Sequence, residues 1–194
     1  SSGLVVGRRT ATPWMFATVS ELTVSAPDFE SKVQVLASWM QHQVRYVSIQ
    51  IGIGGYQPHP AGDIFRNRYG DCKDKATLMS TMLKQAGIDS EYVVVNLFDR
   101  DAVTPDVPSS GYFNHMILAI RLPGDEYKGA PAVFKDKAGQ RWLLFDPTDE
   151  HLAVGTIEGS MQGSYGLLVN GARGELVRFP PQILIRITST PTVR

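Results

Sequence analysis

The sequence predicts a mixed domain of helices and strands in which one amphipathic helix packs against a sheet. After Tyr69-Gly70-Asp71, apolar side chains recur at three- and four-residue steps from Ala76 to Ala86, which is the spacing of one face of a helix. Gly87 follows this run, and glycine commonly ends a helix because it adopts the left-handed conformation. Residues 91–96 come next and are rich in Val and Tyr, which favour strands. The apolar stripe of the helix is therefore expected to face a sheet.

The length of 194 residues predicts one main domain, which we place at residues 25–180. Residues 1–24 are interpreted as an N-terminal extension or the remnant of a preceding domain. Residues 181–194 are interpreted as a C-terminal strand or a linker to a following domain. The first residues, Ser1-Ser2-Gly3, are neither a signal peptide nor a natural initiator. We therefore expect the chain to be a piece of a larger multidomain protein.

The composition excludes several classes of function. Lys plus Arg and Asp plus Glu number 19 each, and no basic run alternates with aromatic residues, so no nucleic-acid partner is predicted. The single cysteine excludes an internal disulfide framework and a cysteine-based zinc cluster. No apolar run is long enough to span a bilayer. We expect no metal and no other cofactor.

The other elements are predicted from local patterns along the chain. Leu4 to Glu21 mixes short β-like pieces with Pro13. A helix is expected to begin at an N-cap on Ser25 and to run to about Val44. In order, we then expect a strand at 45–53, a helical turn at 63–68, a loop at 99–111, strands at 112–122 and 141–146 joined by a charged connection, a glycine-rich loop at 155–174, and strands at 175–179 and 183–188.

The only cysteine, Cys72, lies at or just before the first turn of the amphipathic helix. A helix start has free N–H groups and the positive end of the macrodipole, and both favour thiolate over thiol. Lys73 and Lys75 add positive charge nearby, whereas Asp71 and Asp74 act against it. This position suits a nucleophile. The alternative is a structural role, because a lone cysteine is most often a small buried hydrophobic residue.

Two later residues complete a possible catalytic set. His115 lies inside the apolar strand YFNHMILAIRL, and Asp146 ends the next strand, before Pro147. If the two strands are antiparallel neighbours, the two side chains meet on one face, and the Cys72 helix packs across the same sheet. Thiol acyl chemistry needs this arrangement of base and orienting acid. The structural alternatives are a core histidine bonded to backbone and an ordinary turn aspartate.

Three segments carry a resemblance to a known family. RYGDCKDKATLMSTMLKQAGI, YFNHMILAI and WLLFDPTD resemble the three motif blocks of the transglutaminase-like superfamily. The approach RYVSIQIGIGGYQPHPAGDIFRNRYGDCKDKA is similar to that of bacterial members found inside larger, often exported, proteins. The resemblance covers about residues 25–180 and implies an α+β papain-like fold with the cysteine helix packed on an antiparallel sheet. It also implies that Cys72 is the nucleophile, His115 the base and Asp146 the orienting acid.

The chain departs from animal transglutaminases at three points. Lys73 follows the cysteine where they carry an aromatic residue, and no acidic loop has the ligand spacing for calcium. Their oxyanion hole uses a tryptophan shortly upstream, whereas here Trp39 lies on an earlier helix. The oxyanion donor therefore stays open. The candidates for oxyanion or substrate binding are Tyr56 and Gln57 in the glycine-rich loop and Asn114 beside the histidine, while the nearby His59 is interpreted as a loop histidine.

The resemblance implies a metal-independent thiol enzyme that acts on an amide or peptide bond through an acyl-enzyme. With water as acceptor it is a peptidase or amidase, and with an amine it is a transglutaminase. The partner is then a peptide or protein substrate, and the resemblance to exported proteins suggests an extracytoplasmic location. The alternative function is a non-catalytic peptide- or protein-binding module on the same fold. A redox or metal-binding thiol is disfavoured, because no second cysteine is present and the four histidines are scattered.

Overall fold

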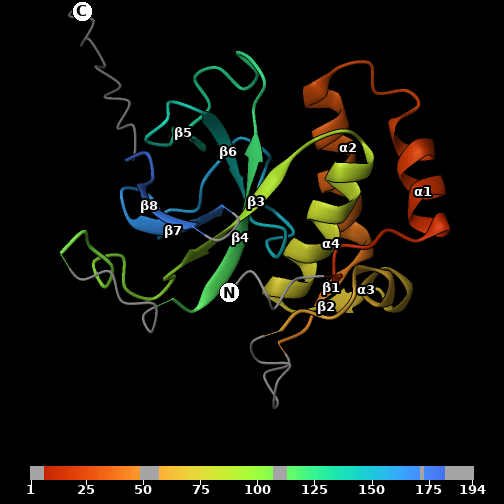
Figure 1. The fold of residues 1–194 in the computed structure, drawn as a ribbon, viewed down its shortest axis with the longest axis horizontal. Coiled ribbons are helices and arrows are strands. Elements are labelled where there is room, and N and C mark those ends of the chain that lie inside the picture. The colour runs from red at the N-terminus through yellow and green to blue at the C-terminus, as the bar shows by residue number, and fades with distance from the viewer. Residues whose placement is uncertain (1–6, 49–56, 107–112, 171–172, 182–194) are drawn as a thin grey trace, which may run out of the picture.

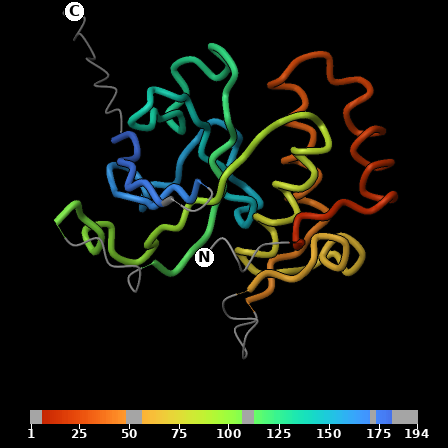
Figure 2. Tube along the Cα trace, viewed as in Figure 1, coloured from red at the N-terminus to blue at the C-terminus, as the bar shows by residue number. Residues whose placement is uncertain are grey.

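The computed structural model describes residues 7–48, 57–106, 113–170 and 173–181. Helices gather on one side of the molecule and a curled sheet forms the other side (Figure 1). The tube in Figure 2 shows the chain passing from the helices to the sheet after α4. The elements are α1 (Pro13–Thr23), α2 (Phe29–Gln43), β1 (Arg45–Tyr46), α3 (Ala61–Asn67), β2 (Tyr69–Gly70), α4 (Cys72–Gln85), β3 (Ser90–Val95), β4 (His115–Arg121), β5 (Val133–Lys135), β6 (Arg141–Phe145), β7 (Tyr165–Asn170) and β8 (Arg173–Arg178).

Helix α1 replaces the β-like pieces that were expected up to Glu21. Thr12 caps it by accepting a hydrogen bond from the backbone N–H of Met15 at 3.3 Å, and Pro13 occupies the first turn, where no N–H is needed. Met15 and Val19 are buried in the core that α2 and α4 share. The expectation was wrong because the short β-like pieces were weighed more heavily than the Thr12-Pro13 pair, which starts a helix.

Helix α2 begins later than the sequence suggested. Its N-cap is Asp28 and not Ser25, because the Asp28 carboxylate accepts a hydrogen bond from the backbone N–H of Ser31 at 2.7 Å. The helix ends at Gln43, close to the predicted end, and Val44 is its C-cap. β1 therefore begins directly after the C-cap of α2.

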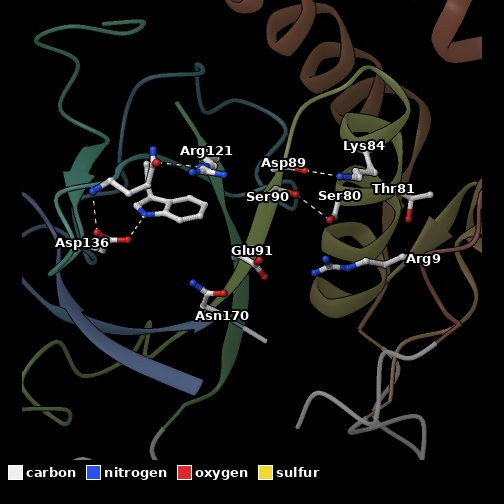
Figure 3. A pocket seen from close by; sticks show the side chains of 13 residues that line it. Arg9, Ser80, Thr81, Lys84, Asp89, Ser90, Glu91, Arg121, Asp136 and Asn170 are labelled. Atoms are coloured by element: carbon white, nitrogen blue, oxygen red, sulfur yellow. Dashed lines mark hydrogen bonds and ion pairs between the residues drawn. The ribbon is translucent and has the colours of Figure 1, made fainter. Parts of the chain in front are cut away.

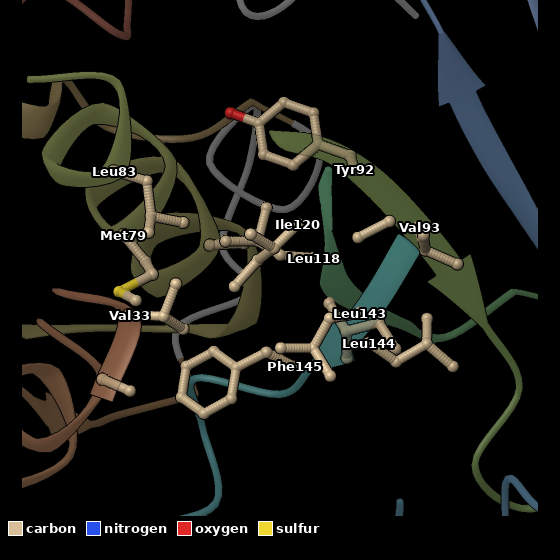
Figure 4. Close-up of a cluster of buried hydrophobic side chains, with 14 of the residues drawn as sticks. Val33, Met79, Leu83, Tyr92, Val93, Leu118, Ile120, Leu143, Leu144 and Phe145 are labelled. Atoms are coloured by element: carbon tan, nitrogen blue, oxygen red, sulfur yellow. The ribbon is translucent and has the colours of Figure 1, made fainter. Parts of the chain in front are cut away.

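Helix α4 is the central helix of the fold. The predicted stripe is buried, and Met79 and Leu83 lie against Leu118 and Ile120 of the sheet (Figure 4). The helix ends at Gln85, and Gly87 has the left-handed conformation that was predicted, with φ of +79°. Its other faces are buried as well, because it lies between the helices and the sheet.

The main sheet has six strands in the order β5-β6-β4-β3-β7-β8, and all of its neighbours are antiparallel. Two of these strands were not predicted. β5 has only three residues within the expected charged connection, and β7 lies in the expected glycine-rich loop. Within β7, position 166 is a glycine for a steric reason, because a Cβ there would collide with the ring of Phe179. The strand expected at 183–188 lies outside the described residues.

A separate pair of two-residue strands, β1 and β2, runs parallel. The strand expected at 45–53 is present only as β1, and residues 49–53 lie outside the described residues. The register places Arg45 beside Tyr69 and Tyr46 beside Gly70, two residues before Cys72. This pairing brings β1 to the start of α4. No helix in the described part of the chain is long and apolar enough to cross a membrane.

Candidate active site

Cys72 is the first residue of α4, and its side chain is partly exposed. A reciprocal capping box fixes this helix start. The Asp71 carboxylate accepts from the backbone N–H of Asp74 at 3.2 Å, and the Asp74 carboxylate accepts from the backbone N–H of Asp71 at 3.3 Å. The thiol therefore stands at the positive end of a well-formed helix.

His115 and Asp146 meet on one face of the sheet. β4 and β6 are antiparallel neighbours, and Leu118 pairs with Phe145. Continuing that register by one residue puts Asp146 opposite Ile117, diagonal to His115 on the same face. The ring atom Nε2 of His115 lies 2.7 Å from Oδ2 of Asp146, and both side chains are buried.

The Asp146 carboxylate is fixed on its other oxygen as well. Oδ1 accepts hydrogen bonds from the backbone N–H of Thr148 at 2.8 Å and from its hydroxyl at 2.7 Å. The hydrogen bonds from Thr148 thus fix the orientation of the carboxylate that binds the His115 ring. The ring also interacts with the side chain of Cys72, through a hydrogen bond that contributes to the pKa of His115. The structure thus groups the three residues at one site.

The electrostatics of this site favour a charged imidazole. Burial of the ring lowers the pKa of His115, but its hydrogen bonds to Asp146 and Cys72 and their negative charges outweigh burial and raise the pKa to about 10. Burial raises the pKa of Asp146, but the hydrogen bond and charge of His115 and the hydrogen bonds from Thr148 bring it below its ordinary value. The buried carboxylate of Asp146 therefore stabilises the protonated form of His115.

Tyr46 of β1 is a residue of this site that the sequence reasoning missed. Burial raises the pKa of its phenol, and the negative charge of Cys72 raises it further, followed by smaller contributions from Asp71 and Asp146. Its side chain is 41% exposed and also forms a hydrogen bond with Ser48. A protonated phenol is an O–H donor, and this one interacts electrostatically with Cys72.

Buried lysines surround the first turn of α4. Lys73 forms an ion pair with Asp71, and both side chains are buried. Lys75 has no exposed surface, and its Nζ donates to the backbone carbonyl of Val44 at 2.6 Å. Burial lowers the pKa of Lys75, and the charges of Glu150 and Asp146 oppose that shift. Val44 directly precedes β1, so the hydrogen bond from Lys75 links the cysteine helix to the strand that contains Tyr46.

Comparison with known proteins identifies the family. A family model described as the transglutaminase-like superfamily matches residues 17–147. The chain belongs to the transglutaminase-like superfamily. This confirms the family that the three motif blocks predicted, together with the expected α+β fold in which the cysteine helix packs on an antiparallel sheet.

Two solved structures resemble this transglutaminase-like chain. A candidate protease from Parabacteroides distasonis superposes with a TM-score of 0.61 at 15% identity, covering 93% of this chain and 30% of that one. A candidate cysteine protease from Cytophaga hutchinsonii gives a TM-score of 0.48 at 17% identity, covering 74% of this chain and 42% of that one. The chain therefore spans less than half of either protein. A search of curated proteins gave no match.

The other site candidates lie in three different situations. Tyr56 is outside the described residues, and Gln57 is half-buried shortly before α3 and takes part in an interaction of its own. Asn114 supports the turn after β3, where its Oδ1 accepts from the backbone N–H of Leu97 at 3.0 Å and its Nδ2 donates to Asn96 at 2.9 Å. Both polar atoms of the Asn114 amide therefore form hydrogen bonds within this turn.

His59 has a more definite role than a free loop histidine. Its backbone N–H donates to Oδ1 of Asp74 at 2.8 Å, and its Nδ1 lies 3.0 Å from Oδ2 of the same carboxylate. It thereby anchors the loop before α3 to the first turn of α4. Across the described parts of the chain, no three His, Cys, Asp or Glu side chains are grouped as a metal site requires.

Proposed function

We propose that this domain catalyses thiol-dependent acyl transfer at amide or peptide bonds, through an acyl-enzyme on Cys72. The observation that carries the proposal is the line of hydrogen bonds from Cys72 to His115 and on to Asp146, with 2.7 Å between Nε2 and Oδ2. His115 supplies and removes protons, and Asp146 orients the ring.

The proposed reaction has two steps. First, the Cys72 thiolate attacks the carbonyl carbon, and His115 gives its proton to the leaving nitrogen as the C–N bond breaks, which leaves a thioester. Second, an acceptor loses a proton to His115 as it attacks the thioester, and the C–S bond breaks to restore the thiolate. Because His115 starts and ends protonated, its pKa of about 10 suits the resting ion pair.

We propose Tyr46 and the backbone N–H of Cys72 as the oxyanion donors. The first N–H groups of a helix have no intrahelical partner, so the Cys72 N–H is free to face a substrate oxygen. The Tyr46 phenol lies near the thiol and stays protonated because its pKa is raised. One such donor contributes about 3–4 kcal/mol to transition-state stabilisation. Tyr46→Phe removes that O–H, together with its hydrogen bond to Ser48, and keeps the ring, so it tests this part of the proposal.

Water is the acceptor we favour, which makes the reaction a hydrolysis. Cys72 is partly exposed and Tyr46 is 41% exposed, so water can reach a thioester at this position. The candidate proteases among the structural neighbours fit this choice. Incubating the protein with p-nitrophenyl acetate and a fluorescent primary amine separates the two acceptors. Hydrolysis releases free acetate, whereas transamidation gives an acetylated amine.

The binding-module alternative is less well supported. It would be favoured if the N-terminal extension covered the thiol. In its described part, residues 7–24, helix α1 packs on α2 and α4, and Cys72 stays partly exposed. An accessible thiol hydrogen-bonded to a buried His–Asp pair is expected of an enzyme rather than of a module that only binds.

The pH dependence of Cys72 alkylation by iodoacetamide tests the proposal. A free thiol titrates near pH 8.5, so an unpaired Cys72 would react faster only towards about pH 8–9. We expect a rate that stays high well below pH 8 and collapses in His115→Ala. Cys72→Ala, which should fold normally, gives the background. A wild-type rate that rises only near pH 8–9, or no labelling without denaturant, would overturn the proposal.

A further inference from the structure

A cavity of about 560 Å³ is lined by residues that are close in sequence to those of the candidate active site. It is formed by the end of α2, β1, the end of α3 and the turn after β6. Its lining includes Arg45, Arg68, His42, Glu150 and His151. Three of these segments also build the active site. Arg45 precedes Tyr46, Arg68 stands four residues before Cys72, and Glu150 stands four residues after Asp146.

Arg68 occupies a position that is costly for an arginine. It caps α3 in the left-handed conformation, with φ of 60° and ψ of 28°, where glycine or asparagine is favoured. Its guanidinium lies 4.6 Å from the ring centres of both Trp39 and Phe65, and those rings stack on each other at 5.4 Å. The stack holds the guanidinium plane, and its N–H donors have no hydrogen-bond or ion-pair partner within the described residues.

Arg45 stands next to Arg68, because the backbone N–H of Arg45 donates to the carbonyl of Arg68 at 2.9 Å. The Arg45 guanidinium also lacks a hydrogen bond or ion pair to any part of the chain that the structure describes. The one acid of the cavity, Glu150, interacts electrostatically with the buried Lys75. The cavity thus contains two arginines with open donors and little negative charge to balance them.

In a larger cavity, of about 630 Å³, many polar side chains form hydrogen bonds or ion pairs with one another (Figure 3). There Lys84 forms an ion pair with Asp89 at 2.6 Å, Arg121 donates to Gln140 at 3.0 Å, and Trp142 donates to Asp136 at 2.9 Å. Its polar groups are largely paired with one another. By contrast, Arg45 and Arg68 are exposed, and their guanidinium groups have no such partner among the described residues.

We propose that the arginine cavity binds a carboxylate of the substrate. Arginine presents paired N–H donors that match the two oxygens of a carboxylate, and aromatic stacking keeps that fork pre-oriented. The carboxylate is an acidic side chain or a terminal carboxylate of the same peptide whose amide reaches Cys72. This inference rests on the proposed function and extends it to substrate class: acidic peptides.

The first test uses two matched probes, acetyl-Ala-Glu and acetyl-Ala-Gln chloromethyl ketones, which alkylate Cys72. We expect the acidic probe to react about tenfold faster than the neutral one at low salt, and the advantage to shrink as ionic strength rises. The advantage is expected to disappear in Arg45→Gln and in Arg68→Gln. Arg178→Gln is the matched control, because Arg178 also stacks on an aromatic ring, at 5.8 Å from Tyr165, but lies on β8.

A second arm tests a terminal carboxylate as the source. Trialanine with a free carboxylate is expected to slow Cys72 alkylation by iodoacetamide, whereas trialanine amide is not. Preference for the acidic probe identifies a side chain, and protection by the free acid identifies a terminus. Equal rates for both probes, together with equal protection by both peptides, would overturn the cavity proposal. Absence of any labelling by iodoacetamide would instead overturn the proposed function.

Circular dichroism shows whether each variant keeps the secondary structure of the wild type. Arg45 is exposed, and its side chain makes no hydrogen bond or ion pair within the described residues, so Arg45→Gln is the variant expected to keep the native fold. If Arg45→Gln is folded and still prefers the acidic probe as strongly as the wild type does, the cavity proposal is wrong.

Discussion

The two ends of α4 face the same sheet but bury opposite kinds of side chain. The last turns bury Met79, Met82 and Leu83 in the hydrophobic core. The first turn buries Lys73 and Lys75, together with the acids of its capping box. Burial of apolar area stabilises the fold without specifying one geometry, whereas each buried charge is tolerated only with a partner at the right place. We infer that the second half of the helix stabilises the fold and that the first turn fixes the position of the thiol.

Asp146→Asn should have the largest effect, and it acts on chemistry. The amide leaves the shape intact but no longer stabilises a charged His115, so acylation of Cys72 should fall about 10³- to 10⁴-fold. The burst of p-nitrophenol released from p-nitrophenyl acetate measures the acylation rate. Thr148→Val removes only one of the two hydrogen bonds to Oδ1 and should cost far less. Similar losses in both variants would contradict the role given to the carboxylate.

Asp71→Ala tests the charged first turn of α4. It removes the N-cap and leaves Lys73 buried without its ion-pair partner, which should lower the free energy of unfolding by about 3–5 kcal/mol. The same change at the solvent-exposed N-cap of α2, Asp28→Ala, should cost clearly less. Urea denaturation measures both. Equal losses would show that the buried pair contributes nothing beyond capping.

Met82→Ala tests the apolar end of the same helix. Met82 is fully buried, so the change should lower the free energy of unfolding by about 2–5 kcal/mol. Below the new melting temperature, the pH dependence of Cys72 alkylation should match that of the wild type. A shifted pH profile would mean that the two ends of α4 are not separable in the way we infer.

The pH dependence of stability should follow the protonation of Asp146 and His115. The pKa of Asp146 is lowered on folding, so its contribution is present above its ordinary value of 3.8 and is lost as pH falls below it. The pKa of His115 is raised, so its contribution is complete below 6.5 and is lost as pH rises through about 10. Melting temperature should therefore decline on both sides of neutrality, and the alkaline decline should be weaker in His115→Phe. An unchanged alkaline decline would assign it to other groups.

The sequence predicted the parts of the site that depend on local pattern. Helical spacing located α4 and placed Cys72 at its start. Strand alternation allowed His115 and Asp146 to share a face, and the antiparallel pairing of β4 with β6 shows that they do. Those elements are long and regular, so periodicity was sufficient.

The remaining parts depend on tertiary contacts that local pattern does not encode. Tyr46 interacts electrostatically with Cys72, and it is placed near the start of α4 by two short strands, distant in sequence, that pair in parallel. β5 and β7 are short or interrupted by glycine, and their strand conformation comes from their neighbours in the sheet. The N-cap at Asp28 was missed because Ser25 offered an equally good local signal.

The protonation state of His115 is the most direct test of the central claim, that Cys72, His115 and Asp146 act as one charged unit. NMR of the protein labelled with ¹⁵N-histidine follows the ring nitrogens as pH is raised, and His115→Gln assigns the signal. We expect an imidazolium that persists through pH 8 and titrates near pH 10, with a lower pKa in Cys72→Ala. A ring that titrates near 6.5 and does not respond to Cys72→Ala would contradict the account.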